Sequence, residues 1–324
     1  MAAFDEKKGE ELKGLLGGLG SDDGAPEAIS GLVKGLGIRA LTSCGVLEAM
    51  SDKLANDKTK EGKGAEAGCN LFGALVGTLG VHFEPFGVPM LGQVIACYDH
   101  KAPTVREAAI TAATSLVSSV NPNAVRLVLP ALFGGMKAKG FREKCGALTL
   151  LAALSVHARG KVGMCLPVIV PELTDCLWDT KKETQKCAID TLAECCVVVE
   201  NPDIKVLIPT LISANARPEE CPACIDRLMA VVFVQTVDAP TLSIIVPILA
   251  RGLRNRDEQI KRKCCVVIDN MCKLVLDPLD AAPFGPKLLP ELNRLDEWAT
   301  QEVRAVGERA RATLNSCLEH KPDH

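Results

Sequence analysis

The stretch Ile244-Ile-Val-Pro-Ile-Leu249 decides the fold of this chain, because its proline, followed two residues later by a leucine, recurs along the sequence. Six copies follow one another at a regular spacing: Pro89/Leu91, Pro130/Leu132, Pro171/Leu173, Pro209/Leu211, Pro247/Leu249 and Pro290/Leu292. Successive prolines lie 41, 41, 38, 38 and 43 residues apart. A period near 40 residues is typical of HEAT and armadillo arrays, whose repeats are helix pairs. The sequence therefore predicts an all-α, HEAT/armadillo-type superhelical solenoid of about seven helix pairs.

Each repeat is expected to have a first helix that carries the proline and a second helix with one apolar face. A proline inside a helix removes one hydrogen bond and bends the helix. Apolar residues recur every three or four positions in 105–120, 188–199 and 260–275, which indicates the second helices. Repeats end at Asn-Pro or Asp-Pro pairs, since the residue before a proline disfavours helical backbone. These pairs are Asn121-Pro122, Asn201-Pro202 and Asp277-Pro278.

The chain divides on this pattern into a cap, an array and a tail. Residues 1–44 are expected to form N-terminal capping helices, because the first repeat would otherwise expose its stacking face. The HEAT-repeat array is predicted at 45–319, followed by a tail at 320–324. The predicted repeats span 45–81, 82–120, 121–159, 160–200, 201–237, 238–276 and 277–319.

Composition limits the classes of function. The net charge is −3 and aromatic residues make up 3% of the chain, which argues against a surface built as a whole to hold nucleic acid. No apolar run is long enough for a membrane span, and the charged first residues show no secretory signal. Fifteen cysteines without such a signal point to a reducing compartment. We expect a soluble, cytoplasmic protein with no membrane partner.

No catalytic, metal or cofactor site is expected, so the chain is predicted not to be an enzyme. Gly87 and Gly92 have the spacing of a phosphate-binding loop, but the lysine and hydroxyl residue that such a loop needs are missing. Cys221 and Cys224 form a CxxC pair, which favours buried structural thiols. Two alternatives stay open for this pair: a metal site completed by a neighbouring repeat, and a redox pair.

Basic residues gather at two turns and are the candidate partner-binding residues. One group follows Thr180 in the fourth predicted repeat, and the other crosses the turn of the sixth. The set is Lys181, Lys182, Arg251, Arg254, Arg256, Lys261, Arg262 and Lys263. A basic ridge along one edge of a solenoid suits RNA backbone or acidic proteins. The alternative is an ordinary solvated turn.

Four segments, 177–184, 241–253, 260–263 and 267–274, resemble the N-terminal HEAT region of translation elongation factor 3. The related central region of the general-control translational activator is similar too. The resemblance implies a module that docks on the ribosome, largely on the head of the small subunit. In that family the ATPase work belongs to ABC domains, and no Walker A motif occurs here. The implied function is therefore a non-catalytic, translation-linked protein-binding module with no small-molecule substrate.

A second hypothesis is a HEAT scaffold or adaptor subunit of another large assembly, such as a cytoskeletal or ciliary (axonemal) complex. The near-neutral charge and the cysteine-rich, aromatic-poor composition are compatible with it. The sequence leaves open which partner is bound and whether the chain is a fragment of a longer protein.

Overall fold

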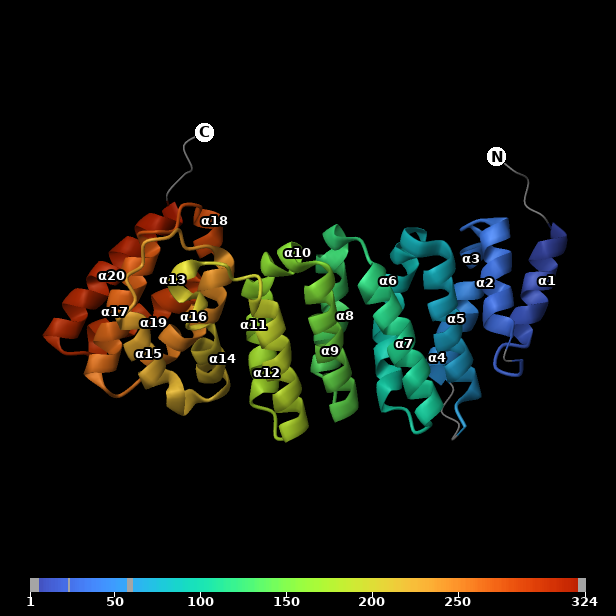
Figure 1. The fold of residues 1–324 in the computed structure, drawn as a ribbon, viewed down its shortest axis with the longest axis horizontal. Helices are drawn as coiled ribbons and strands as arrows, with labels where there is room; N and C mark the ends of the chain where they lie inside the picture. Colours follow the sequence, from blue (N-terminus) through green and yellow to red (C-terminus); the bar gives the residue numbers. More distant parts are fainter. Residues whose placement is uncertain (1–5, 23, 57–60, 320–324) are drawn as a thin grey trace. The chain divides into compact units, whose positions relative to one another are not determined.

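α-Helices dominate the computed structural model, which describes residues 6–22, 24–56 and 61–319. Within these ranges there are twenty α-helices and four short 3-10 helices, and no strand beyond an isolated bridge between Leu19 and Asp22. The all-α, HEAT/armadillo-type fold predicted from the proline pattern is confirmed (Figure 1). The chain forms two compact units, residues 1–158 and residues 159–324. The predicted tail at 320–324 lies outside the described residues.

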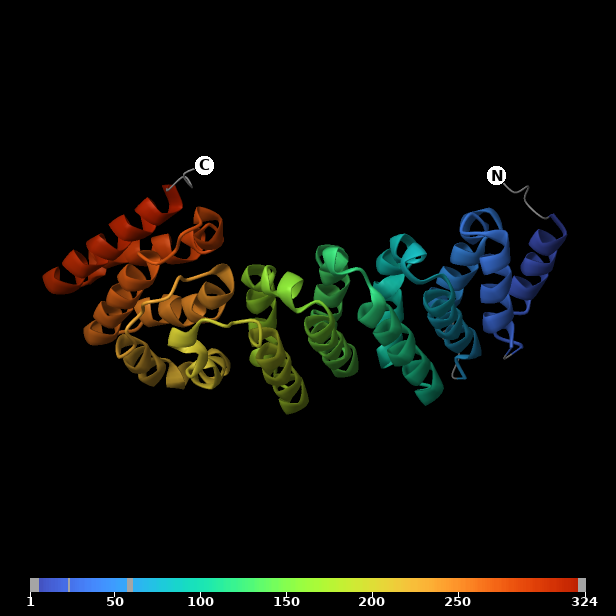
Figure 2. The same ribbon diagram turned by 45° about the horizontal axis from the view of Figure 1, so that its top comes forward.

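The first unit packs its helices in two rows. One row contains α4 and the proline-bearing helices α6 and α8, and the other row contains α2, α5, α7 and α9. Contacts run along each row and within each pair (Figures 1 and 2). The elements are α1 (Glu6–Gly17), α2 (Ala25–Leu36), α3 (Ala40–Ser43), α4 (Val46–Asn56), α5 (Lys63–Leu79), η1 (Gly80–His82), α6 (Glu84–Ala96), η2 (Cys97–Asp99), α7 (Pro103–Ser119), η3 (Pro122–Ala124), α8 (Val125–Met136) and α9 (Phe141–His157). The capping role predicted for residues 1–44 stays a prediction.

The second unit repeats the arrangement, with α11, α14, α16 and α19 in the proline-bearing row. Its elements are α10 (Arg159–Gly163), α11 (Leu166–Leu177), α12 (Lys182–Cys196), α13 (Pro202–Lys205), α14 (Ile208–Ala216), η4 (Pro218–Glu220), α15 (Cys221–Met229), α16 (Ala239–Leu253), α17 (Glu258–Cys272), α18 (Pro278–Ala281), α19 (Gly285–Trp298) and α20 (Gln301–Glu319). Because α14 and α15 have only nine residues each, α16 also contacts α11 directly. The boundaries of the seven predicted repeats stay a prediction.

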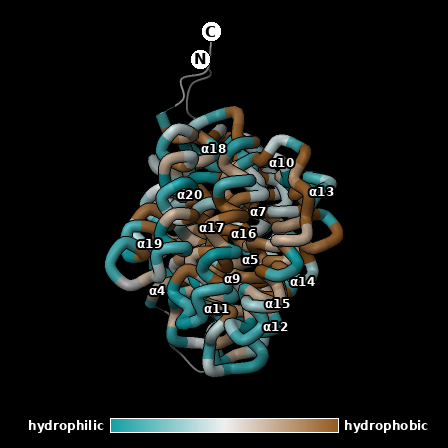
Figure 3. Tube along the Cα trace, turned by 90° about the vertical axis from the view of Figure 1, so that its left-hand side faces the viewer, coloured by the Kyte–Doolittle hydropathy of each residue, from teal (hydrophilic) through white to brown (hydrophobic). Residues whose placement is uncertain are grey.

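α16 is the central helix of the second unit. Eleven of its fifteen residues are buried, and it contacts helices of both rows. In Figure 3 the trace at the α16 label is coloured as hydrophobic. Because most of α16 is buried, the few polar side chains near its C-terminal end, among them Arg251, have a fixed direction.

The proline pattern works because two residues separate the ring from the leucine. Five of the six prolines are exposed and Pro247 is half-buried, whereas each following leucine is at most 1% exposed. Two positions along a helix correspond to a rotation of about 200°, so the ring faces solvent when the leucine faces the core. Water then satisfies the carbonyl that loses its helical donor. The pattern is thus a marker of one buried and one solvated helix face.

One detail of the prediction is wrong. Five of the prolines lie inside helices, but Pro209 occupies the first turn of α14. The residues before α14 form the separate helix α13, whose N-cap is the side chain of Asn201. The new helix α14 then begins after its own N-cap residue, Leu207. Proline is tolerated in a first turn because no helical donor is lost there.

Within the described residues, no single helix has both the length and the apolar character needed to cross a membrane. One bent pair, Pro103–Ser119 with Pro122–Met136, meets those requirements jointly on length and composition alone, at an angle of 110°.

Candidate functional site

The turns within helix pairs place the predicted basic residues at one edge of the second unit. Lys181 and Lys182 lie where α12 begins, and Arg254 and Arg256 lie in or beside the turn between α16 and α17. Arg251 links the two regions, because its guanidinium carbon lies 4.8 Å from the centre of the ring of Trp178, the residue that ends α11. Arg251 therefore connects the C-terminal end of α16 with the end of α11, three residues before Lys181.

Arg251 itself is a structural residue. Its side chain is half-buried, and its Nη1 donates hydrogen bonds to the carbonyl of Ala214 (2.9 Å) and to Sγ of Cys221 (3.1 Å). Its contact with the Trp178 ring is a cation–π interaction. The side chain thus ties α16 to α11, α14 and α15, and its donors point into the unit and away from a partner.

Arg254 is held by a buried carboxylate of the next pair. Its Nη2 lies 2.6 Å from Oε1 of Glu291, which is 5% exposed and which also accepts from Arg294. The hydrogen bond from Arg254 lowers the pKa of Glu291, and the same bond raises the pKa of Arg254. Since Arg254 remains 62% exposed, one part of its guanidinium still meets solvent.

The three consecutive cations of α17 each meet an acidic side chain. Lys261 Nζ lies 2.6 Å from Glu258 and Lys263 Nζ lies 2.6 Å from Asp226. Arg262 Nε lies 3.0 Å from Glu302 as an ion pair that lacks hydrogen-bond geometry. Most of the positive charge that the sequence shows in this segment is therefore neutralised within the unit.

Three members of the predicted set project outward from rigid turns. Lys181, Lys182 and Arg256 are exposed, and neither Lys182 nor Arg256 has an ion pair among the described residues. The Lys181 amide donates to Oδ1 of Asp179 (2.9 Å), which fixes the entry to α12. The amide of Asp257, next to Arg256, donates to Oδ1 of Asn255 (2.9 Å). Side-chain-to-backbone bonds of this kind hold a turn in one shape.

Sequence reasoning missed further basic residues at turns of this kind. Lys186 is exposed one helical turn after Lys182, so the i, i+4 spacing could have found it. In the first unit the turn between α8 and α9 carries exposed Lys139 and Arg142. Arg142 lies 5.2 Å from the ring of Phe141. Basic charge at turns within helix pairs therefore occurs in both units.

The CxxC pair lies inside α15. Both thiols are buried, Cys221 lies 3.3 Å from the carbonyl of Ala214, and burial raises the pKa of Cys224 to about 12. A thiol with so high a pKa is protonated at neutral pH and is a poor nucleophile or metal ligand. Across the described parts of the chain, no three histidine, cysteine or acidic side chains are grouped to hold a metal ion.

Two families of HEAT repeats match the sequence. Residues 22–192 match the family described as "EF3 N-terminal HEAT repeat", and residues 220–324 match "Elongation factor 3/GNC1 HEAT repeat". Elongation factor 3 of Phytophthora infestans is 45% identical over 233 residues, which are 71% of this chain and 22% of that protein. Stalled ribosome sensor GCN1 of Homo sapiens is 32% identical over 302 residues, which are 91% of this chain and 11% of that protein.

The chain thus spans less than a quarter of the length of these two relatives. Among solved structures, a designed armadillo repeat protein aligns over 83% of this chain and all of its own, with 12% identity and a TM-score of 0.33.

Proposed function

Because the chain belongs to the EF3 N-terminal HEAT repeat family, the resemblance seen in its sequence is confirmed, and we propose that it is a ribosome-binding module linked to translation. The family match carries this proposal, together with the similarity to the stalled ribosome sensor GCN1. The relatives named above bear no cytoskeletal or ciliary names, so the second hypothesis gains no support. We expect the module to be cytoplasmic and to act without catalysing a reaction.

The contact is proposed to run through the exposed turn cations of the second unit. Lys181, Lys182 and Arg256 lie on rigid turns at one edge, where they would meet ribosomal RNA phosphates or acidic protein surface. Arg254 contributes through its exposed part, and Lys261, Arg262 and Lys263 contribute less because acidic side chains already neutralise them. Pre-ordered turns favour binding because little conformational entropy is lost on contact.

Co-sedimentation with purified ribosomes over a salt series tests the proposal. The wild-type chain should co-sediment at low salt and be released as salt rises. The double variant Lys181→Glu/Lys182→Glu and the single variant Arg256→Glu should bind more weakly, because each replaces an attractive charge with a repulsive one. Within the described part of the chain, neither Lys182 nor Arg256 takes part in an ion pair that its substitution would break.

Lys205→Glu is the matched control. Lys205 is also an exposed lysine of the second unit, but it lies on the connector helix α13 between pairs and not on a turn within a pair. It should leave binding unchanged. Absence of ribosome binding by the wild-type chain would refute the proposed function. An equal loss of ribosome binding in the turn variants and in Lys205→Glu would refute the proposed contact edge. It would show that binding depends only on the net charge of the chain.

A further inference from the structure

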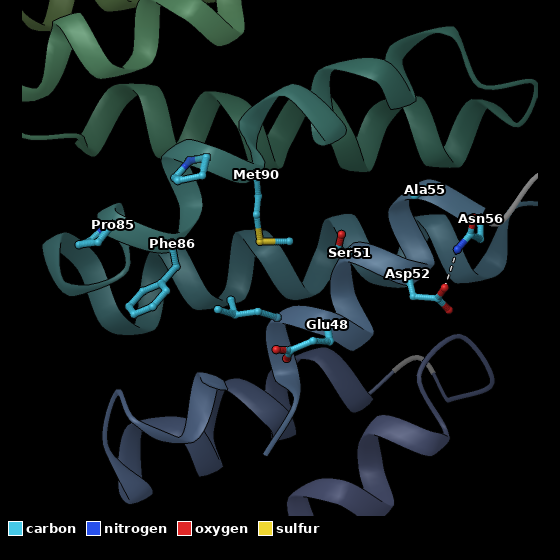
Figure 4. Close-up of a pocket in the computed structure, with 10 residues that line it drawn as sticks. Glu48, Ser51, Asp52, Ala55, Asn56, Pro85, Phe86 and Met90 are labelled. Atoms are coloured by element: carbon cyan, nitrogen blue, oxygen red, sulfur yellow. Dashed lines mark hydrogen bonds between the residues drawn. The ribbon is translucent and has the colours of Figure 1, made fainter. Parts of the chain in front are cut away.

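A groove with a volume of about 650 Å³ lies between α4 and α6 of the first unit. Figure 4 shows Glu48, Ser51 and Asp52 on α4 and Phe86 and Met90 on α6, with Asp52 turned toward Asn56. The volume falls within the range of roughly 300–1,000 Å³ that is usual for ligand sites. Nothing in the proposed ribosome contact uses this surface.

The walls of the groove are held in place from both helices. Ser51 Oγ donates a hydrogen bond of 3.0 Å to Oε1 of Gln93, which ties α4 to α6 across the floor. A Cβ atom added to Gly87 of α6 would lie 3.4 Å from Cδ1 of Leu116 on α7, so α6 packs against α7 at this point. The groove therefore lies between two adjacent helices that a side-chain hydrogen bond joins.

Apolar side chains form one part of the lining. Leu47 and Phe86 are half-buried and Met90 is 9% exposed, so their free faces meet the groove and not the core. An aromatic ring beside a carboxylate suits a guanidinium, which can stack on the ring and bond to the carboxylate at once.

Acceptors form the other part of the lining. Glu48 and Asp52 are exposed on the same face of α4, four residues apart, and no ion pair joins either of them to a cation within the described parts of the chain. One oxygen of Asp52 accepts a hydrogen bond from the side-chain amide of Asn56. Like charges at this spacing disfavour a helix, and a bound cation removes that repulsion. Pro89 has no N–H, so the carbonyl of Pro85, which also lines the groove, lacks its usual helical donor.

We propose that this groove binds a protein segment that carries an arginine or lysine flanked by large apolar side chains. The basic group bridges Glu48 and Asp52 beside Phe86, and the apolar side chains pack on Leu47 and Met90. Nucleic acid is a poor occupant because its phosphates would meet the two carboxylates. The site is independent of the ribosome contact, which lies in the other unit.

Selection from a random library of 12-residue peptides displayed on phage, with the immobilised full chain as bait, provides the probe. Selected peptides should share a basic residue next to leucine, isoleucine, phenylalanine or tryptophan. A synthetic copy of one such peptide, labelled for fluorescence anisotropy, should bind the double variant Glu48→Arg/Asp52→Arg at least tenfold more weakly. Phe86→Ala should also weaken binding severalfold.

The matched control is Glu6→Arg/Glu10→Arg, two exposed glutamates at the same spacing on α1 of the same unit. This control should retain wild-type affinity, and Glu48→Gln/Asp52→Asn gives a milder test if the reversal fails to fold. Selection of peptides that lack a basic residue, or that bind the groove and control variants equally, would overturn the proposal. Concentration-dependent dimerisation that Glu48→Arg/Asp52→Arg abolishes would also overturn it, because a second copy would then be the occupant.

Discussion

Replacing Arg251 with alanine should destabilise the second unit by about 2–4 kcal/mol. A hydrogen bond from a charged group contributes about 1.5–3 kcal/mol, and Arg251 donates one of 2.9 Å to the carbonyl of Ala214. The cation–π contact with the ring of Trp178, a residue that is 48% exposed, contributes about 0.5–1 kcal/mol. These two contributions together give the expected loss, and the weaker contact to the Cys221 sulfur is left out of it.

Urea denaturation followed by circular dichroism measures this loss, and hydrogen exchange locates it. Exchange should speed up at the ends of α11, α14 and α16, which Arg251 joins, while the first unit stays unchanged. A double-mutant cycle with Trp178→Ala should give a coupling of about 0.5–1 kcal/mol for the ring contact.

Arg256→Ala is the control, five residues away on the exposed turn. It should change stability by less than about 0.5 kcal/mol, as surface substitutions usually do, and it should weaken ribosome binding. The opposite pattern, with Arg251→Ala as stable as the wild type and defective in binding, would refute the assignment of Arg251 as a structural residue.

Three further predictions concern charge and packing. The pKa of Glu291 is lowered in the folded chain, so its contribution to stability is complete above the unfolded pKa and is lost as the pH falls through the folded pKa. Glu291→Gln should therefore lower the free energy of unfolding by roughly 1–2 kcal/mol at pH 7 and by less in acid, measured by urea denaturation. Gly252→Ala should destabilise the fold by about 1–3 kcal/mol, because the added Cβ would lie 2.6 Å from Ile225. Gly134→Ala, with open space around the added Cβ, should stabilise the fold by about 0.5–1 kcal/mol. Thermal unfolding measures both changes. Glu220→Gln should release Arg217 from its 2.6 Å ion pair and strengthen salt-sensitive ribosome binding; unchanged binding would show that this turn lies outside the contact.

The fold was predictable because its signal lies in a short, repeated pattern. An exposed proline and a leucine two residues later report both the first helix of a pair and the face it buries, as Pro171 and Leu173 show. The position of Pro209 at a helix start was not predictable from this pattern, because the separate helix α13 depends on the cap from Asn201.

The candidate residues were predictable as a group but not one by one. Sequence shows that Arg254, Lys261, Arg262 and Lys263 are basic, but it does not show which acidic side chains reach them. Arg254 and Lys263 find their partners in the neighbouring pair: Glu291 and Asp226 lie 37 positions away from them, close to the repeat period. Lys261 instead pairs with Glu258 on its own helix. Charges on facing helices of adjacent pairs therefore cancel at a separation that local charge counting overlooks.

The repeat period alone would still not identify the free cations, because acidic side chains near a basic residue compete for it. Glu220 lies 38 positions after Lys182, about one period, a separation at which an ion pair could form. Glu220 instead pairs with Arg217, three residues before it on the same turn, because a local partner is reached without ordering a long side chain across the gap between pairs. The exposure of Lys182 is therefore the outcome of a competition in three dimensions. The same competition decides which turn cations remain available to a partner.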